Sequence, residues 1–459
     1  MAAPAPTLKL SSKLAYGFGD VTGAVIAAVY GFYMQAFLLD VAGLAPATAG
    51  IIFAIAQFWD AVTDPAMGRI SDLTRSRWGR RRPYLLFGAV PLGLAFFLHW
   101  LVPPFGPETL FFYYLVVALL MRTAFTVVSI PYTALTPDLA PDHDGRTQLN
   151  LYRFVFSIFG GLAAVILHPV IVASAGDVYV GHMLSAGVWF VVIVVSTLTC
   201  FAFTRERPEH LERVDTAMSY GKRLAIVLGN RPYLIATGIY LLSWLALQFI
   251  QANLLLYARY WLDAEAQFTS YVAVLQVTAA AFLFVWTFVS ARAGKKATYV
   301  AGISVWIAVL IGLFFVQPGQ AWLLYGVAFL AGIGLSAAYL IPWSMLPDTI
   351  EHNELMTGER QEGLFYGFFV FLQKLGLSVG LGLSGWALGE AGYLTPAVEG
   401  GELQLVAQPD SVLLTLRIFV SFVPAVVLLL SIPLALAYPI SKARHEEIVA
   451  ALEKRKSAG

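Results

Sequence analysis

The stretch Phe58-Trp59-Asp60-Ala61-Val62-Thr63-Asp64-Pro65 places two carboxylates inside a long apolar run. Asp60 and Asp64 are four residues apart, so on a helix they lie on one face, one turn from each other. Thr63 adds a hydroxyl beside them, and Pro65 has no N–H to give to the carbonyl of the preceding turn. If this helix spans a membrane, these oxygens predict a site for a hard cation.

The two acids also have a second interpretation. A carboxylate in hydrocarbon costs at least about 2.5–3.5 kcal/mol on insertion scales, so an ionised pair needs a bound cation or a basic partner. Asp60 and Asp64 therefore either hold a cation, or pair with a basic side chain or stay protonated. We favour the cation site, with sodium or a proton as the ion and no other cofactor.

Composition defines the class of protein. Of 459 residues, 59% are hydrophobic and 12% are charged, whereas soluble domains have about 45–50% and about 25%. Apolar runs of about 20 residues predict membrane helices and not the short alternating strands of a barrel. The net charge of +1 gives no reason to expect nucleic acid as a partner. The single cysteine, Cys200, excludes an intrachain disulfide or a cysteine metal site.

We expect an all-α polytopic membrane protein with about twelve spans, by the length needed to cross the bilayer. The expected spans lie near 21–40, 46–69, 84–102, 108–135, 149–175, 180–203, 232–259, 266–290, 298–316, 320–345, 363–392 and 412–438. A polar, arginine-rich stretch after the sixth divides them. We expect a six-helix bundle over 1–204, a cytoplasmic linker over 205–231, and a second six-helix bundle with a cytoplasmic tail over 232–459.

The basic residues occur in alternate loops, which predicts topology. The loop after the second span, the central linker and the C-terminal tail are rich in Lys and Arg, while opposite loops such as 103–107 and 175–181 have none. By the positive-inside rule both termini and the linker are cytoplasmic. We expect a monomeric, multi-pass protein of the plasma (inner) membrane. Its expected partners are the lipid bilayer, a monovalent cation and a small-molecule substrate.

An arginine-rich turn follows the second span. It runs Gly68-Arg-Ile-Ser-Asp72 and then Arg77-Trp-Gly79-Arg-Arg-Arg82, and Arg292-Ala-Gly294-Lys-Lys296 follows the eighth span. A basic turn alone can simply fix topology, but the shared placement favours the internal repeat of a transporter whose two bundles rock. The residues that we expect to act in conformational gating are Gly68, Asp72, Arg77 and Gly79.

Other charges lie within the expected spans. Arg153 either snorkels to the cytoplasmic face or serves as counter-charge to the acid pair or donor to substrate. Lys374 is too deep to snorkel easily, so we expect it to face a central cavity. Arg122 and Arg417 are candidates for pairing between the bundles. Asp20 begins the first expected span and is interpreted as a helix cap.

Polar and aromatic side chains in the spans suit a sugar, whose apolar face stacks on rings while its hydroxyls take hydrogen bonds. Aromatic residues are also common at membrane interfaces, so any single one is more often packing than ligand. The residues that we expect to contact substrate, beside Arg153 and Lys374, are Ser129, Tyr339, Gln251 and Trp343.

These segments resemble the glycoside–pentoside–hexuronide:cation symporter family of the major facilitator superfamily, whose best-known member is melibiose permease. The likeness is densest at Tyr16-Gly-Phe-Gly, Trp59–Pro65, Ser76-Arg-Trp-Gly79, Ile130-Pro-Tyr132, Trp343–Asp348, Phe365-Tyr and Gln373-Lys374. The resemblance implies that Asp60, Thr63 and Asp64 bind the cation with Thr126. It also implies that Arg153 and Lys374 lie in or beside the central site.

The chain also looks similar to the animal sodium-dependent lysophosphatidylcholine transporters. Like them, it lacks the acidic sugar ligands of the permease, in whose places it has Ala24 and Ser129. We expect a cation-coupled symporter that works by alternating access. A glycoside, small sugar or sugar acid is the leading substrate and a lysophospholipid the alternative. A nucleotide-driven pump, an enzyme and a channel are not expected, because no phosphate-binding loop, catalytic domain or filter sequence is found.

Overall fold

The computed structural model describes residues 8–140, 143–206, 226–358 and 362–458. The regular secondary structure of these residues is helical apart from one short hairpin, and the chain divides into two compact units. The N-terminal unit comprises Met1–Asp215 with Tyr393–Ala407, and the C-terminal unit comprises Thr216–Gly392 with Gln408–Gly459. Residues 207–225, most of the expected linker, lie outside the described residues.

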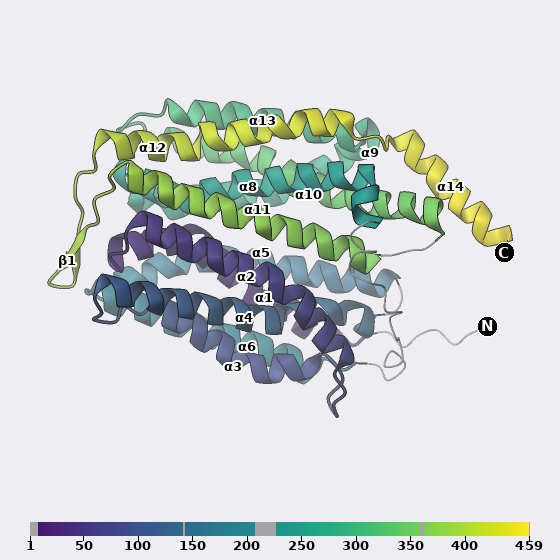
Figure 1. Ribbon diagram of the computed structural model, residues 1–459, viewed down its shortest axis with the longest axis horizontal. Helices are drawn as coiled ribbons and strands as arrows, with labels where there is room; N and C mark the ends of the chain where they lie inside the picture. Colours follow the sequence, from purple (N-terminus) through teal and green to yellow (C-terminus); the bar gives the residue numbers. More distant parts are fainter. Residues whose placement is uncertain (1–7, 141–142, 207–225, 359–361, 459) are drawn as a thin grey trace. The chain divides into compact units, whose positions relative to one another are not determined.

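The N-terminal unit contains the helices drawn from purple to blue in Figure 1. They are α1 (Leu10–Val29), the π-helical turns η1 (Tyr30–Met34) and η2 (Phe37–Val41), α2 (Pro46–Leu73), α3 (Arg82–His99), α4 (Pro107–Leu139), α5 (His143–Ala173) and α6 (Val178–Phe203). Helix α1 packs against α5 and α6, and α4 packs against α2 and α3. The α2–α4 contact is the one that positions the acid pair.

The C-terminal unit contains the helices drawn from teal to yellow (Figure 1). They are α8 (Arg231–Tyr260), η4 (Glu265–Gln267), α9 (Phe268–Phe314), α10 (Leu323–Thr357), α11 (Glu362–Glu390), α12 (Asp410–Val420), α13 (Phe422–Ala437) and α14 (Lys442–Ala458). Helix α10 packs mainly against α9, and α8 packs against α10, α11 and α13. A core centred on Tyr299, Trp306 and Leu335 fills this unit.

The described chain has ten helices long and apolar enough to cross a membrane. One of them includes α9, whose 47 residues would extend about 70 Å, more than twice the hydrocarbon core. Helix α9 breaks at Gly294, where φ is 82°, a conformation that glycine adopts readily because it has no Cβ atom. It therefore supplies two spans, which agree with the expected 266–290 and 298–316.

Helix α2 is not one of those ten, because Asp60, Asp64 and further charges lower its apolar character. Its 28 residues are nevertheless long enough to cross the core, and it packs along α4. With α2 and both halves of α9, the described helices agree with the expected twelve spans. The prediction of an all-α polytopic membrane protein is confirmed.

The first span differs from its expected position. It was placed at 21–40 with Asp20 as a cap, but α1 begins at Leu10 and continues through η1 and η2 to Val41. Asp20 therefore lies in the middle of a helix. The physical reason is that Arg153 pairs with Asp20, so its charge does not have to lie at a helix end.

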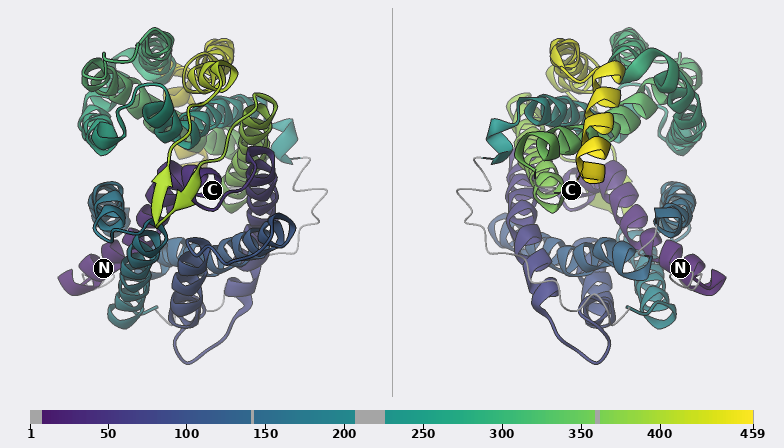
Figure 2. Two further views of the ribbon diagram at one scale, coloured as in Figure 1. Left: turned by 90° about the vertical axis from the view of Figure 1, so that its left-hand side faces the viewer. Right: turned by 90° about the vertical axis from the view of Figure 1, so that its right-hand side faces the viewer.

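The segment 393–407 belongs to the N-terminal unit, although it joins α11 to α12. Its strands β1 (Ala397–Glu399) and β2 (Glu402–Gln404) form an antiparallel hairpin that lies beside the ends of N-terminal helices (Figure 2, left). The Tyr393 hydroxyl donates a hydrogen bond to buried Asp40, and the Val178 N–H donates to the Gly401 carbonyl at 2.7 Å. The sequence analysis placed this segment with the second bundle.

Candidate functional site: an acid pair between two helices

Thr126 of α4 joins the two carboxylates of α2. Its Oγ1 lies 2.9 Å from Oδ1 of Asp60 and 2.8 Å from Oδ1 of Asp64. A hydroxyl has one proton, so it donates to one carboxylate while both oxygens stay within reach. Asp60 and Thr126 are each 1% exposed, and Asp64 is half-buried. Asp60 and Asp64, on successive turns of α2, thus lie close to Thr126 of α4.

Thr63 lies at the edge of this cluster. Its hydroxyl is 3.5 Å from Thr126 Oγ1 and donates to the backbone carbonyls of Trp59, at 3.1 Å, or Asp60, at 3.3 Å. A threonine hydroxyl has lone pairs left after such donation, so its oxygen remains able to face a cation. Helix α2 continues through Pro65 without a break. The structure thus brings together the four residues of the predicted cation site.

Arg122 approaches the same site from α4. One of its guanidinium nitrogens, Nη1, lies 3.8 Å from Oδ2 of Asp60. This distance is within the range of an ion pair but beyond that of a charge-assisted hydrogen bond. The sequence analysis named Arg122 as a candidate for pairing between the bundles and left its role open. The acid that it contacts, Asp60, lies in its own unit, and Arg122 is one turn of α4 away from Thr126.

Arg417 also pairs within its own unit. Its guanidinium donates to the Phe314 carbonyl at 2.8 Å and lies 4.2 Å from the ring centres of both Trp261 and Phe314. The charge is met by a backbone dipole and two aromatic faces. The sequence analysis left the role of Arg417 open, and these contacts lie within the C-terminal unit.

Arg153 does not serve the acid pair as counter-charge. Its Nε and Nη2 lie 3.2 and 3.0 Å from Oδ1 of Asp20, and its guanidinium covers the ring of Tyr132 at 5.2 Å. The Tyr132 hydroxyl in turn donates to the Tyr16 carbonyl at 2.7 Å. Arg153 thus ties α5 to α1 and α4. The sequence analysis missed this ion pair because it treated Asp20 as a cap.

The remaining predicted substrate residues are divided between the two units. Ser129 follows Thr126 on α4 and is half-buried, while Gln251 on α8 and Lys374 on α11 are half-buried in the C-terminal unit. Beside Lys374, the Gln373 side-chain oxygen accepts a hydrogen bond from Tyr240 at 3.0 Å. The structure describes each unit by itself, so the assembly of these residues into one site remains a prediction.

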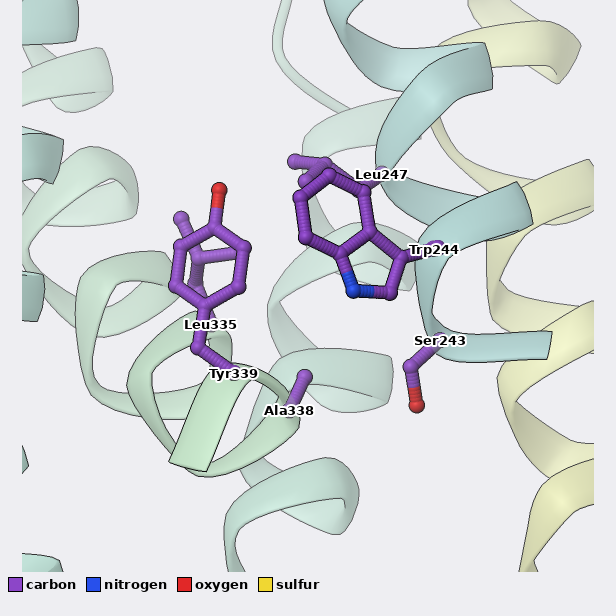
Figure 3. A pocket seen from close by; sticks show the side chains of 6 residues that line it. All are labelled: Ser243, Trp244, Leu247, Leu335, Ala338 and Tyr339. Atoms are coloured by element: carbon purple, nitrogen blue, oxygen red, sulfur yellow. The ribbon is translucent and has the colours of Figure 1, made fainter. Parts of the chain in front are cut away.

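Tyr339 and Trp343 belong to an aromatic group in the C-terminal unit. The Tyr339 ring lies 5.5 Å from that of Trp244, and Trp343 lies 5.6 Å from Tyr240 and 5.5 Å from Phe369. Tyr339 and Trp244 face each other across a crevice that is too narrow for a water molecule (Figure 3). The two rings therefore pack against each other in this conformation.

The arginine-rich turn after α2 forms an ion-pair network. Asp72 lies 3.0 Å from Arg81, and Asp138 near the end of α4 lies 3.0 Å from Arg81 and 2.9 Å from Arg80. The carboxylate of Glu206 accepts hydrogen bonds from the backbone N–H groups of Arg80, Arg81 and Arg82, at 2.8–2.9 Å. An acid at the beginning of α3 is favourable because the free N–H groups there carry partial positive charge.

Of the four predicted gating residues, Asp72 and Gly79 take part in this network. Gly79 has φ 104°, and a Cβ atom there would lie 2.5 Å from the Glu206 carboxyl carbon. Gly68 lies on α2, where a Cβ atom would be 3.9 Å from a side-chain methyl of Ile130 on α4. Arg77 stacks on Trp78 at 4.2 Å instead of joining the network.

The C-terminal unit repeats this arrangement. Lys295, next to the break in α9, donates to both carboxylate oxygens of Asp348 at 2.7 Å. Asp348 follows Pro347 near the end of α10, as Asp138 follows Pro137 near the end of α4. The segments Ile130-Pro-Tyr-Thr and Ile341-Pro-Trp-Ser precede the two acids. This repeated motif is the sequence signal that could have identified Asp138 and Asp348 as partners of the basic turns.

Among the described residues, helices that agree with twelve spans, a repeated basic turn and a buried acid pair define a membrane transporter with the major facilitator fold. Solved structures of low identity share this fold. A mutant of the nucleoside transporter NupG has a TM-score of 0.63 at 16% identity and covers 94% of this chain and 98% of its own. A bacterial homologue of the lysosomal transporter Spinster, in an inward-facing conformation, has a TM-score of 0.63 at 13% identity and covers 96% and 97%.

The chain belongs to the family described as MFS/sugar transport protein, which it matches over residues 15–442. A protein of Synechocystis sp. described as an uncharacterized symporter is 36% identical and covers 98% of both chains. The sodium-dependent lysophosphatidylcholine symporter 1-A of Danio rerio is 30% identical and covers 96% of this chain and 87% of its own.

Proposed function

We propose that this transporter is a cation-coupled symporter and that Asp60, Asp64, Thr63 and Thr126 bind the coupling cation. The observation that carries the proposal is Thr126 Oγ1, which lies within hydrogen-bond distance of both carboxylates. Carboxylate and hydroxyl oxygens are the ligands that a hard cation prefers. Two helices supply them, so bound cation would also fix α2 against α4.

Sodium is the proposed ion. A proton binds to a single oxygen, whereas sodium is coordinated by several oxygens at once. The cluster provides two carboxylates and two hydroxyls, which suits sodium. The name of the Danio rerio relative, a sodium-dependent symporter, supports the same choice. Cation and substrate would each raise the affinity of the other by the same factor, which is what couples their transport.

The proposed substrate is a lysophospholipid. Relatives from Danio rerio and Mus musculus, 30% and 29% identical, are named sodium-dependent lysophosphatidylcholine symporters, and both cover 96% or more of this chain. A lysophospholipid carries a phosphate, for which Lys374 on α11 is the proposed cationic partner. Positions 24 and 129 are Ala and Ser, neither of which offers a carboxylate for sugar hydroxyls.

A glycoside or small sugar acid is the second candidate. The family description includes sugar transport, and the group of Tyr240, Trp343 and Phe369 beside Gln373 combines aromatic faces with an amide. A ring of this kind can stack on a sugar, and an amide can bond its hydroxyls. The two candidates differ in where they bind, because a lipid tail needs an apolar channel that a sugar does not.

Membrane placement completes the proposal. The arginine- and lysine-rich turns before α3 and within α9 would face the cytoplasm by the positive-inside rule, together with both termini. The proposed localisation is the plasma (inner) membrane. The transmembrane potential would then drive inward sodium movement with about 2.3 kcal/mol per charge at 100 mV.

The test is uptake into proteoliposomes. Purified protein would be reconstituted, and uptake of radiolabelled lysophosphatidylcholine and of a panel of glycosides would be measured with an inward sodium gradient, a proton gradient or neither. Sodium-stimulated lysophosphatidylcholine uptake is expected. Uptake that is equal under all three conditions would reject cation coupling, and stimulation for a glycoside alone would reject the lipid.

A further inference from the structure

Arg122 has a position that the proposed cation site does not require. It lies four residues before Thr126 on α4, so both side chains leave the same face of the helix. Thr126 Oγ1 contacts Oδ1 of Asp60 at 2.9 Å, and Arg122 Nη1 contacts Oδ2 of the same carboxylate at 3.8 Å. One oxygen of Asp60 is thus held by a neutral donor while the other faces a fixed positive charge.

The charge of Arg122 is permanent. A guanidinium keeps its proton in proteins, so Arg122 cannot leave the site by losing its charge and can only move away. Its side chain is 24% exposed, whereas that of Asp60 is 1% exposed. The carboxylate is therefore the buried partner, and the arginine has a more open environment into which it can withdraw.

The contact is also loose. The nitrogen–oxygen distance of 3.8 Å exceeds the 3.0 Å between Arg153 and Asp20 in the same unit. Charge-assisted hydrogen bonds lie at about 2.7–2.9 Å, so Arg122 stabilises the negative charge of Asp60 without occupying a hydrogen-bond position on Oδ2. A small cation that reaches Asp60 would meet a repulsive guanidinium and displace it.

We propose that Arg122 is a tethered counter-ion that competes with the coupling cation for Asp60. In the empty site it neutralises Asp60, and when the cation binds it withdraws. It thereby lowers the affinity of the site for the cation. This inference rests on the proposed function, since it takes Asp60 as a ligand of the coupling cation.

The experiment measures sodium binding directly. Isothermal titration calorimetry with sodium chloride, against choline chloride as ionic-strength control, gives the dissociation constant for purified wild type, Arg122→Gln and Arg122→Lys. Arg122→Gln is expected to bind sodium about tenfold more tightly, because the competing charge is gone. Arg122→Lys, which keeps the charge, is expected to stay within about threefold of wild type.

The matched control is Arg417→Gln, which removes an arginine from a helix of the C-terminal unit, where it contacts Trp261 and Phe314. It is expected to leave the dissociation constant unchanged. If Arg122→Gln does not insert, Arg122→Met replaces it, because methionine keeps much of the length without the charge. A glutamine or methionine variant with wild-type sodium affinity would overturn the inference.

The outcomes separate this inference from the proposed function. If wild type binds sodium and the uncharged variant binds no more tightly, the inference fails and the proposed function stands. If wild type does not bind sodium but the variant does, Arg122 fills the site permanently, so the inference holds and sodium coupling fails. If neither binds sodium, both fail.

Discussion

Thr126 on α4 lies 2.8 Å from Asp64 on α2, and this contact joins two helices through a polar group inside an apolar unit. A polar contact at this depth stabilises the helix pair only while both partners are satisfied. Because Thr126 also lies 2.9 Å from Asp60, the hydroxyl holds the two carboxylates close together. Two carboxylates held this close repel each other, and a bound cation would offset that repulsion. This is the basis of the proposed cation site.

Replacement of Thr126 tests its part in the site. Thr126→Val keeps the shape and removes the hydroxyl, so sodium loses one oxygen ligand and the carboxylates lose their shared donor. We expect the sodium concentration for half-maximal uptake to rise about tenfold or more. A change of this size corresponds to the free energy of one lost hydrogen bond to a charged group. Thr126→Ser restores a hydroxyl and is expected to remain close to wild type. Equal sodium dependence of the valine and serine variants would contradict this role.

Gly79 tests the arginine-rich turn. Gly79→Ala forces a side chain into φ 104° and places a Cβ atom 2.5 Å from the Glu206 carboxyl carbon. We expect a loss of about 1–3 kcal/mol in stability, visible as a lower unfolding temperature. The control is Gly106→Ala, because Gly106 has φ −69° and open space around it. Equal unfolding temperatures for the two variants would show that Glu206 does not hold the turn.

The Asp20–Arg153 ion pair predicts non-additive mutations. Both side chains are about one-fifth exposed, so removal of one partner leaves a poorly solvated charge. Asp20→Asn is expected to destabilise the protein by about 3 kcal/mol. The double variant Asp20→Asn/Arg153→Gln removes both charges and is expected to recover part of that loss, as measured by denaturant-dependent tryptophan fluorescence. A double variant whose loss equals the sum of the single losses would mean that the two residues do not interact.

The 393–407 segment is expected to depend on Tyr393. Tyr393→Phe removes the hydrogen bond to buried Asp40 and leaves that carboxylate without this donor. We expect faster hydrogen–deuterium exchange in the hairpin Ala397–Gln404, with a loss of about 1.5–3 kcal/mol in its local stability. Tyr325→Phe, at a more exposed tyrosine of α10, is the control. Unchanged exchange in Tyr393→Phe would show that other contacts hold the hairpin.

The sequence predicted the helices well because hydropathy over about 20 residues depends on the bilayer and hardly on tertiary contacts. It also predicted that Asp60, Thr63, Asp64 and Thr126 gather at one point. For Asp60 and Asp64 the helical spacing was enough, but for Thr126 only the resemblance to known symporters gave the prediction, since α4 is far from α2 in sequence.

The contacts that the sequence could not give involve charges whose partners are distant in sequence. Spacing could not show that Arg153 reaches Asp20, that Arg122 reaches Asp60, or that Arg417 lies on Trp261 and Phe314. Such pairs depend on which helix faces pack together. The docking of the 393–407 segment on the N-terminal unit likewise depends on Tyr393 meeting Asp40, and no local pattern marks that contact.

The most direct test of the account is sodium binding to purified protein in which each acid is neutralised in turn. Calorimetry would compare wild type with Asp60→Asn, Asp64→Asn and, as control, Asp410→Asn, an exposed acid at the beginning of α12. We predict that wild type and the control bind sodium, and that neither Asp60→Asn nor Asp64→Asn binds it detectably while both remain folded. Sodium binding of wild-type affinity in Asp60→Asn and Asp64→Asn would contradict the account.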